Sequence, residues 1–250
     1  MGNRLRDGGD RALNGRVLSG MDRQRFIRAE TRLAPVPFVP EISIHQADEA
    51  TSLWEKTEAE LATIGLPPPF WAFAWAGGRG LARYVLDHPE IVAGKRVVDF
   101  ASGSGLVAIA AARAGAASVE AVDIDSFAAV AIGLNASANG VTIVTGGGDR
   151  IGSPADTDIV LAGDIFYDRG FSERVLPWLT SLARHARVIV GDPGRTYRPA
   201  EGFRELARYE VPAETALEDS LVKQVSILEI LPCRADAGAS PAASCDSASR

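Results

Sequence analysis

The sequence predicts an α/β fold: a doubly wound, mostly parallel sheet of seven strands, with a C-terminal antiparallel hairpin and an N-terminal helical extension. Two observations lead to this prediction. Short apolar strands alternate with helical patterns through the middle of the chain, which is typical of parallel strands joined by helices. The last two predicted strands follow one another with no helical pattern between them, which favours an antiparallel hairpin at one edge.

Four segments are distinguished by composition. Residues 1–21 belong to an arginine-rich, acid-containing stretch with almost no apolar pattern, and we expect a disordered leader there. Residues 22–92 form an extension with helices and an aromatic segment, and residues 93–232 form the core. Residues 233–250 include ten Ala or Ser among eighteen, too little apolar surface to offset the ordering entropy, so we predict a disordered tail.

In the first half of the chain, glycine and proline mark the ends of the predicted elements. Pro67 stops one helix, and Gly115 lies just past the end of another, where glycine is favoured. The elements predicted here are helices over 52–61, 80–87 and 105–114 and strands over 95–100 and 118–123.

In the second half, Ser126 is the expected N-cap of a helix that ends at Gly140. Another helix is marked by Phe171 and Leu182, and Pro177 should kink it or lie in its first turns. The strands predicted here cover 141–145, 158–162, 186–190, 207–211 and 224–230.

Composition also limits the function. The chain has 250 residues, 46% of them apolar, and a net charge of −6; this charge argues against nucleic-acid binding. The two cysteines, Cys233 and Cys245, lie near the C-terminus, so we predict no disulfide framework, no structural metal and a reducing compartment. The uncharged stretch 126–148 is broken by polar residues, so no membrane span is predicted. The Ala-, Arg- and Gly-rich composition is typical of a bacterial cytoplasmic protein.

The most informative turn joins the strand 95–100 to the following helix. It reads Asp99-Phe-Ala101-Ser102-Gly103-Ser-Gly105, and its small residues allow a ligand to approach the backbone at a helix N-terminus. Asp123 ends the next strand, where the hydroxyl groups of a ribose would lie in a nucleotide-binding α/β unit. A tight turn without a ligand is the alternative.

This turn resembles the Asp/Glu-x-Gly-x-Gly-x-Gly motif of class I S-adenosylmethionine-dependent methyltransferases, which have a Rossmann-like fold. Ala101 replaces the first glycine, which is acceptable if its backbone dihedrals are ordinary. A nicotinamide-dependent oxidoreductase is disfavoured because Asp99 precedes the glycines. The resemblance implies S-adenosylmethionine as methyl donor, S-adenosylhomocysteine as product, and no metal.

A second motif, Gly163-Asp164-Ile-Phe-Tyr167, follows the strand 158–162 at the sheet edge where ligands bind. Asp164-x-x-Tyr167 resembles the signature of a group of protein lysine methyltransferases. The alternative is that Asp164 caps the following helix and Tyr167 packs in the core.

Three segments together resemble the methyltransferases that modify the β-subunit of electron transfer flavoprotein. They are residues 71–78 (WAFAWAGG), 163–167 (GDIFY) and 191–195 (GDPGR), and the likeness covers about residues 40–231. It implies that the partner is this protein substrate. It also implies that Trp75 borders the methyl-donor pocket. Asp149 lies where class I methyltransferases often contact adenine, and a solvated loop is the alternative. The alternating Trp71, Phe73 and Trp75 also fit a strand with one aromatic face, and Arg195 also fits a surface charge.

Charge determines the mechanism expected for a lysine substrate. Its amine must be neutral to attack, and a desolvated channel beside a sulfonium lowers its pKa. A carboxylate has the opposite effect, so we expect Asp164 to capture and orient the lysine rather than act as a strong base. Tyr167 would shape the channel. The expected catalytic residues are Asp164 and Tyr167, and the expected cofactor contacts are Trp75, Asp99, Ala101, Ser102, Gly103, Gly105, Asp123, Ile124, Asp149 and Asp164. Another protein or small-molecule methyltransferase, and a non-catalytic binding module, remain as alternatives.

Overall fold

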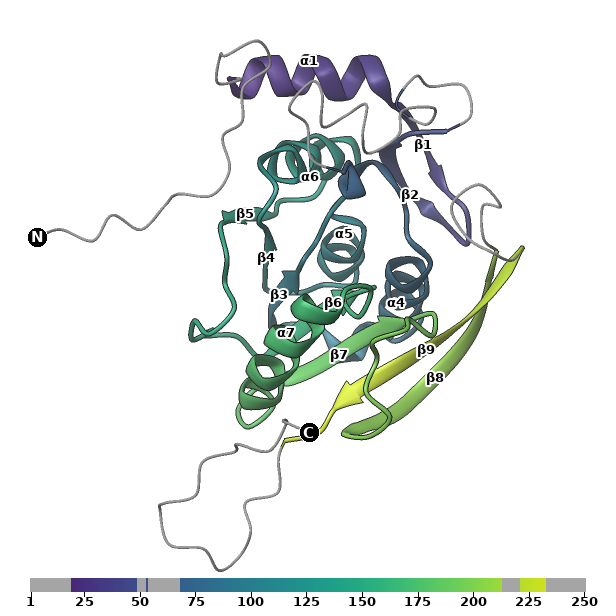
Figure 1. Cartoon of the computed structure of the whole chain (residues 1–250). Helices are drawn as coiled ribbons and strands as arrows, with labels where there is room; N and C mark the ends of the chain where they lie inside the picture. The colour runs from purple at the N-terminus through teal and green to yellow at the C-terminus, as the bar shows by residue number, and fades with distance from the viewer. Residues whose placement is uncertain (1–18, 49–52, 54–67, 213–220, 233–250) are drawn as a thin grey trace, which may run out of the picture.

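A seven-stranded sheet forms the centre of the protein in a computed structural model, which describes residues 19–48, 53, 68–212 and 221–232 (Figure 1). The strand order is β5-β4-β3-β6-β7-β9-β8. The first five strands are parallel, and β9 is antiparallel to both β7 and β8. The sheet and its terminal hairpin are therefore confirmed. The strands are β3 (Arg96–Phe100), β4 (Ser118–Asp123), β5 (Val144–Gly147), β6 (Ile159–Gly163), β7 (Arg187–Asp192), β8 (Phe203–Pro212) and β9 (Val222–Ile230).

Helices cover both faces of the sheet (Figure 1). On one face, α4 (Ala76–Asp87), α5 (Leu106–Arg113) and α6 (Ser126–Ala138) pack against inward-pointing residues such as Leu161. On the other face, α7 (Arg169–Leu182) packs against residues such as Val160. Because neighbouring residues of β6 belong to opposite cores, this strand is apolar throughout, as buried parallel strands are.

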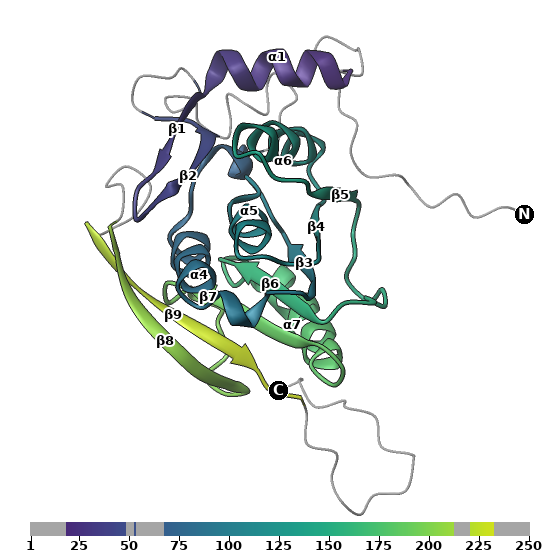
Figure 2. The same cartoon turned by 180° about the vertical axis from the view of Figure 1, so that it is seen from behind.

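The N-terminal extension contains a helix and a two-stranded sheet. Helix α1 (Gly20–Glu30) begins with a capping box made by Ser19 and Asp22, and it packs on α6 in both views (Figures 1 and 2). It begins at Gly20, one residue before the expected end of the leader. Strands β1 (Arg32–Val36) and β2 (Val39–Gln46) pair antiparallel.

The sequence does not predict the pairing of β1 and β2. Both strands contain proline, which is uncommon inside strands. Proline is tolerated here because the ribbon has two strands and each has an open edge. The ribbon is tied to the core where the backbone N–H of His45 donates to Asn135 Oδ1 of α6 at 2.7 Å.

Several element boundaries differ from the prediction. Asp125, not Ser126, caps α6, and its side chain accepts from the backbone N–H of Phe127. Strand β5 begins at Val144 instead of residue 141, and Pro177 lies in the second half of α7 instead of its first turns. Helix α4 begins four residues earlier than expected. The helix predicted over 52–61 lies, apart from residue 53, outside the described residues, as do residues 1–18 and the tail 233–250.

The aromatic segment is not a strand. Residues Phe70–Ala72 form a 3₁₀ turn, η1, and Trp75 is the N-cap residue of α4. Trp71 is buried and stacks on Phe127 of α6, with ring centroids 5.9 Å apart. The alternation of aromatic residues therefore reflects a turn that leads into a helix, with Trp71 in the core. A second 3₁₀ turn, η2 (Pro89–Ile91), follows α4.

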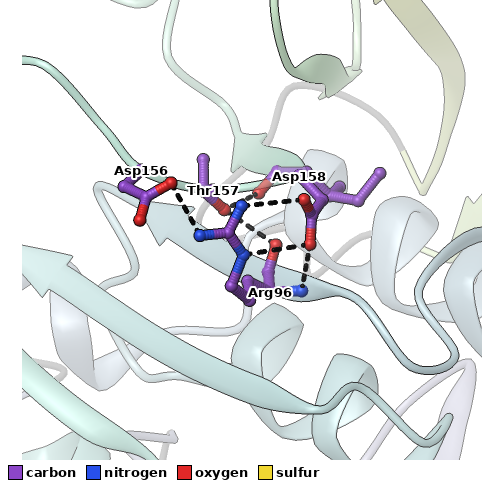
Figure 3. Close-up of polar contacts among 5 residues, drawn as sticks. Arg96, Asp156, Thr157 and Asp158 are labelled. Carbon is purple, nitrogen blue, oxygen red and sulfur yellow. Dashed lines mark hydrogen bonds and ion pairs between the residues drawn. The ribbon is translucent and has the colours of Figure 1, made fainter.

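An exposed ion-pair cluster lies where β3 and β6 begin, at the edge of the sheet opposite the strands' carboxyl ends (Figure 3). Arg96 contacts Asp158 through its backbone N–H at 2.8 Å and its guanidinium at 3.0 Å, and Asp156 at 2.6 Å. The Thr157 hydroxyl donates to the Arg96 carbonyl at 2.8 Å. These contacts tie the loop before β6 to the start of β3.

Candidate active site

A cavity of about 530 Å³ opens at the carboxyl ends of β3, β4 and β6. The chain leaves β3 for β4 on one side and β6 lies on the other, so this is the switch point of the sheet, where ligands of doubly wound folds bind. The volume is within the range of small-molecule sites. All but one of the predicted site residues line the cavity: Trp75, Asp99, Ala101, Ser102, Gly103, Asp123, Ile124, Asp149, Asp164 and Tyr167.

The exception, Gly105, has a packing role. It has φ +82° and immediately precedes α5, and a Cβ placed there would lie 3.2 Å from the Ile132 side chain of α6. Glycine is therefore needed for the turn and for the close approach of α6, and Gly105 is absent from the cavity lining.

Asp99 holds the glycine-rich turn together from below. Its Oδ2 accepts hydrogen bonds from the Ser102 hydroxyl and from the backbone N–H of Ala108, and the residue is 1% exposed. Burial raises the pKa of this carboxyl to about 7, and the nearby Asp123 adds to the increase. Asp99 thus acts first as an internal acceptor for the turn.

Ala101 departs from the expectation of ordinary dihedrals, because its φ is +53°. A residue with a Cβ is disfavoured in this left-handed conformation, in which glycine is not. Alanine therefore replaces the motif glycine at a position whose left-handed backbone conformation favours glycine.

Asp123 lies at the end of β4 and faces the same turn. Its Oδ2 accepts from the backbone N–H of Gly103 at 2.8 Å and its Oδ1 from that of Asp125 at 2.9 Å. Burial raises its pKa. The next residue, Ile124, is 67% exposed although it lines the cavity. A flat apolar ring bound in the cavity would cover this side chain.

Asp149 lines the cavity and is paired with a cation that the sequence did not reveal. Its Oδ1 accepts from the backbone N–H of Ile151 at 3.0 Å, and its Oδ2 forms an ion pair with Arg174 of α7. Both contacts lower the pKa of Asp149, the backbone hydrogen bond most strongly. Arg174 also lines the cavity.

Aromatic side chains surround the end of the cavity near Tyr167. The Tyr167 ring lies 5.6 Å from that of Phe70, and Phe70 lies 6.0 Å from Trp75. The Trp75 indole N–H donates to the Phe70 carbonyl at 3.0 Å. Tyr167 and Phe70 are 50% and 44% exposed. Burial raises the pKa of the Tyr167 phenol, so its hydroxyl stays protonated and can donate a hydrogen bond.

Asp164 caps a helix, but not the one that follows it. Its Oδ2 accepts from the backbone N–H of Gly78, in the first turn of α4, at 2.8 Å. The helix that follows, α7, is capped by Asp168. Asp164 has φ +57° and directly follows the last residue of β6, and its carboxylate contacts the first turn of α4.

Three close backbone approaches bring α4 to this carboxylate. A Cβ on Gly77 would lie 2.6 Å from Asp164 Oδ2, and one on Gly163 would lie 2.8 Å from the Gly78 Cα. One on Gly191 would lie 2.9 Å from the Leu81 Cβ. Only glycine permits the first turn of α4 to rest on the ends of β6 and β7 at these distances.

The second partner of Asp164 is Arg195, which the sequence left as a possible surface charge. Its Nη2 and Nε lie 2.6 and 3.1 Å from Asp164 Oδ1, and its guanidinium lies 5.7 Å from the Trp75 ring centroid. The turn expected at 191–194 positions it: Asp192 Oδ1 accepts from the backbone N–H groups of Gly194 and Arg195. The position of Arg195 just after a strand that ends at the ligand-binding edge was the signal available in the sequence.

Known proteins similar to this chain are methyltransferases. Residues 84–163 match the family model of ribosomal protein L11 methyltransferase (PrmA). The chain is 37% identical over 181 residues to the electron transfer flavoprotein beta subunit lysine methyltransferase of Danio rerio, covering 69% of each chain. It is 33% identical over 209 residues to the homolog from Caenorhabditis elegans, covering 74% of this chain and 84% of that one.

The chain belongs to the electron transfer flavoprotein beta subunit lysine methyltransferase family. It is therefore an S-adenosylmethionine-dependent methyltransferase. Among solved structures, ribosomal protein L11 methylase from Lactobacillus delbrueckii subsp. bulgaricus is similar at 20% identity and a TM-score of 0.48, covering 78% of this chain and 97% of that one.

Among the described residues, no three His, Cys, Asp or Glu side chains are grouped so that they could hold a metal ion. No helix among the same residues is long and apolar enough to cross a membrane.

Proposed function

We propose that this methyltransferase modifies a lysine of the β-subunit of electron transfer flavoprotein. The observation that carries the proposal is that one cavity is lined both by the glycine-rich turn with Asp123 and by Asp164 and Tyr167. Family membership supports the choice of substrate, because the relatives are named for this activity.

The methyl donor fits the part of the cavity that the glycine-rich turn and Asp123 line. Asp123 places a carboxylate beside the Gly103 backbone, where ribose hydroxyl groups can donate to it. Ile124 supplies an apolar surface for adenine, and Asp149 and Arg174 supply polar groups at the rim. Contacts of Ala101, Ser102 and Asp99 with the donor remain predictions of the same proposal.

The part of the cavity that is lined by aromatic side chains suits a lysine side chain. Phe70, Trp75 and Tyr167 can enclose its methylene groups and exclude water, which favours the neutral amine. When bound, S-adenosylmethionine supplies a sulfonium methyl group, to which the amine lone pair forms the new N–C bond while the C–S electron pair passes to sulfur. The chain's own contribution is positioning and desolvation, because an in-line displacement requires both reactants to be aligned.

Partners and location follow from composition and are part of this proposal. A net charge of −6 suits a basic target segment and does not favour nucleic acid. We propose a cytoplasmic location on the same compositional basis as before.

The test is incubation of the protein with S-adenosylmethionine and purified electron transfer flavoprotein, followed by intact-mass spectrometry of its β-subunit. Mass gains in steps of one methyl group are expected from the wild type. Asp123→Asn should bind S-adenosylmethionine more weakly in calorimetry, whereas Asp156→Asn, an exposed change at the opposite edge of the sheet, should match the wild type.

Two other outcomes are informative. Donor binding without a mass gain would reject this substrate and favour another protein or a small molecule. If the protein neither binds the donor nor produces a mass gain, the methyltransferase interpretation of the cavity is rejected.

A further inference from the structure

Arg195 contacts both groups in this site that could bind a lysine ammonium. One is the buried carboxylate of Asp164, and the other is the face of the Trp75 ring. Both attract cations. The cation that contacts them here belongs to the chain itself.

This arrangement is not easily displaced by an incoming lysine. Two guanidinium nitrogens contact Asp164 Oδ1, and the Gly78 backbone N–H fills Oδ2, so both carboxylate oxygens have partners. The Asp164 and Arg195 side chains are only 11% and 20% exposed. Removing one partner from such a pair leaves the other charge buried and uncompensated, which is costly.

We propose that Arg195 is a positioning residue that sets the protonation preference of the site: by holding Asp164 and covering Trp75, it withholds both from a lysine ammonium, so that the target lysine is accepted as the neutral amine. The proposal rests on the proposed function and changes the role expected of Asp164, which anchors Arg195 instead of capturing the lysine. A neutral pair gives an ammonium no net attraction, whereas a lone carboxylate would stabilise it and raise its pKa.

Other charged and titratable groups lie around this pair. The charge of Asp192, on β7, acts on Asp164, and Arg198 pairs with Asp192 instead of with Asp164. Asp99, Asp123 and Tyr167 line the same cavity, and Arg79 is a buried cation of α4. All of these groups are retained in the Arg195 and Asp164 variants. A difference between the pH profiles of those variants therefore reports on the Asp164–Arg195 pair.

The first experiment measures kcat against pH, from about 7 to about 10, with electron transfer flavoprotein as substrate. In Arg195→Gln the apparent pKa of kcat should rise by about one unit or more, because the unpaired Asp164 carboxylate stabilises the ammonium. The double variant Arg195→Gln/Asp164→Asn should return to the wild-type profile, because the pair is again neutral. Arg195→Lys should stay close to the wild type.

Arg198→Gln is the matched control. It removes the same charge from the same loop, but Arg198 pairs with Asp192 at 3.4 Å instead of with Asp164. Its profile should be unchanged. Calorimetric binding of S-adenosylhomocysteine and the unfolding temperature show that each variant is folded.

The second experiment does not depend on the protein substrate. n-Butylammonium is titrated into the full chain with S-adenosylhomocysteine present, and the Trp75 indole N–H signal is followed by NMR, with Trp75→Phe used for assignment. Arg195→Gln should bind the probe at least tenfold more tightly than the wild type, and the double variant should lose that gain.

The two experiments separate the two ideas. A lower rate for Arg195→Gln with an unchanged pH profile, and no gain in probe binding, would overturn the role of Arg195. If electron transfer flavoprotein is not methylated but the probe still binds more tightly to Arg195→Gln, the substrate assignment fails and the role of Arg195 stands. If there is neither methylation nor a gain in binding, both fail.

Discussion

The two edges of the central sheet each carry an arginine–aspartate pair, and the pairs behave in opposite ways. At the amino edge, Arg96 contacts Asp158 in an exposed cluster (Figure 3). At the carboxyl edge, Arg195 contacts Asp164, which is buried. The hydrogen bonds from Arg96 lower the pKa of Asp158 to about 2. Burial raises the pKa of Asp164 although the Arg195 guanidinium lies only 2.6 Å away.

For the buried Asp164 carboxylate, desolvation therefore outweighs the counter-ion, whereas the exposed Asp158 responds mainly to the hydrogen bonds from Arg96. The exposed pair ties two segments together and contributes little to stability. The buried pair lies in the wall of the cavity and joins α4, β6 and the loop after β7, so its charge balance affects both the fold and the site.

The largest expected effect is that of Asp164→Asn. The amide can keep the left-handed conformation and the hydrogen bond from Gly78, but it leaves the Arg195 charge without its partner. We expect a loss of about 3 kcal/mol in the free energy of unfolding, the range for breaking a buried pair. Urea denaturation measures it, and a loss no larger than that of Asp158→Asn would contradict the contrast between the edges.

The next effect is expected for Gly77→Ala. Its Cβ would meet Asp164 Oδ2 at 2.6 Å, and backbone on β7 as well, so α4 must move away from the carboxyl edge. Overpacking of this kind costs about 1–3 kcal/mol. S-adenosylhomocysteine affinity and stability should fall together. Gly133→Ala, on α6 with no atom within 4 Å of the added Cβ, is the control and should bind normally.

The two edges should also show opposite pH dependence. Asp99 has a folded-state pKa raised to about 7, so its contribution to stability is full below its unfolded pKa near 4 and is lost as the pH rises through 7. Replacing it in Asp99→Asn should remove that decline between about pH 4 and pH 7. The unfolding temperatures of the two proteins are compared across this range. A difference that does not vary with pH would show that folding does not raise the pKa of Asp99.

Ala101→Gly is expected to stabilise the protein slightly. With φ +53°, Ala101 is strained in a way that glycine is not, and the gain should be about 1 kcal/mol or less after the greater unfolded-state entropy of glycine is subtracted. Donor affinity should not fall. A decrease in unfolding temperature would show that the methyl group of Ala101 makes contacts that outweigh the strain.

The smallest effect is expected for Asp158→Asn. The folded-state pKa of about 2 means that its stabilisation is present above the unfolded pKa near 4 and disappears as the pH falls through 2. Wild type and variant should therefore converge in stability over that acid range, with activity unaffected near neutral pH. Loss of activity in this variant would show that the amino edge affects the site, which would contradict the contrast between the two edges.

The sequence by itself determined the order of the elements of the central sheet, because short apolar strands such as β6 and β7 alternate with helical patterns, and this alternation depends on local burial. It also determined the place of the site. Asp99, Asp123 and Asp164 each lie at or just beyond the end of a predicted strand, and parallel strands bring their carboxyl ends to one edge. Family membership confirmed the methyltransferase prediction that these residues suggested.

The tertiary structure decided what those residues contact. That Asp164 caps α4, 86 residues away, and that Arg195 covers Trp75 depend on backbones meeting at Gly77, Gly163 and Gly191, which no local pattern encodes. The left-handed φ of Ala101 and the pairing of the proline-containing β1 and β2 likewise result from packing that overrides local preference. Local propensity and periodicity act over a few residues, whereas desolvation and charge pairing depend on everything that surrounds a group.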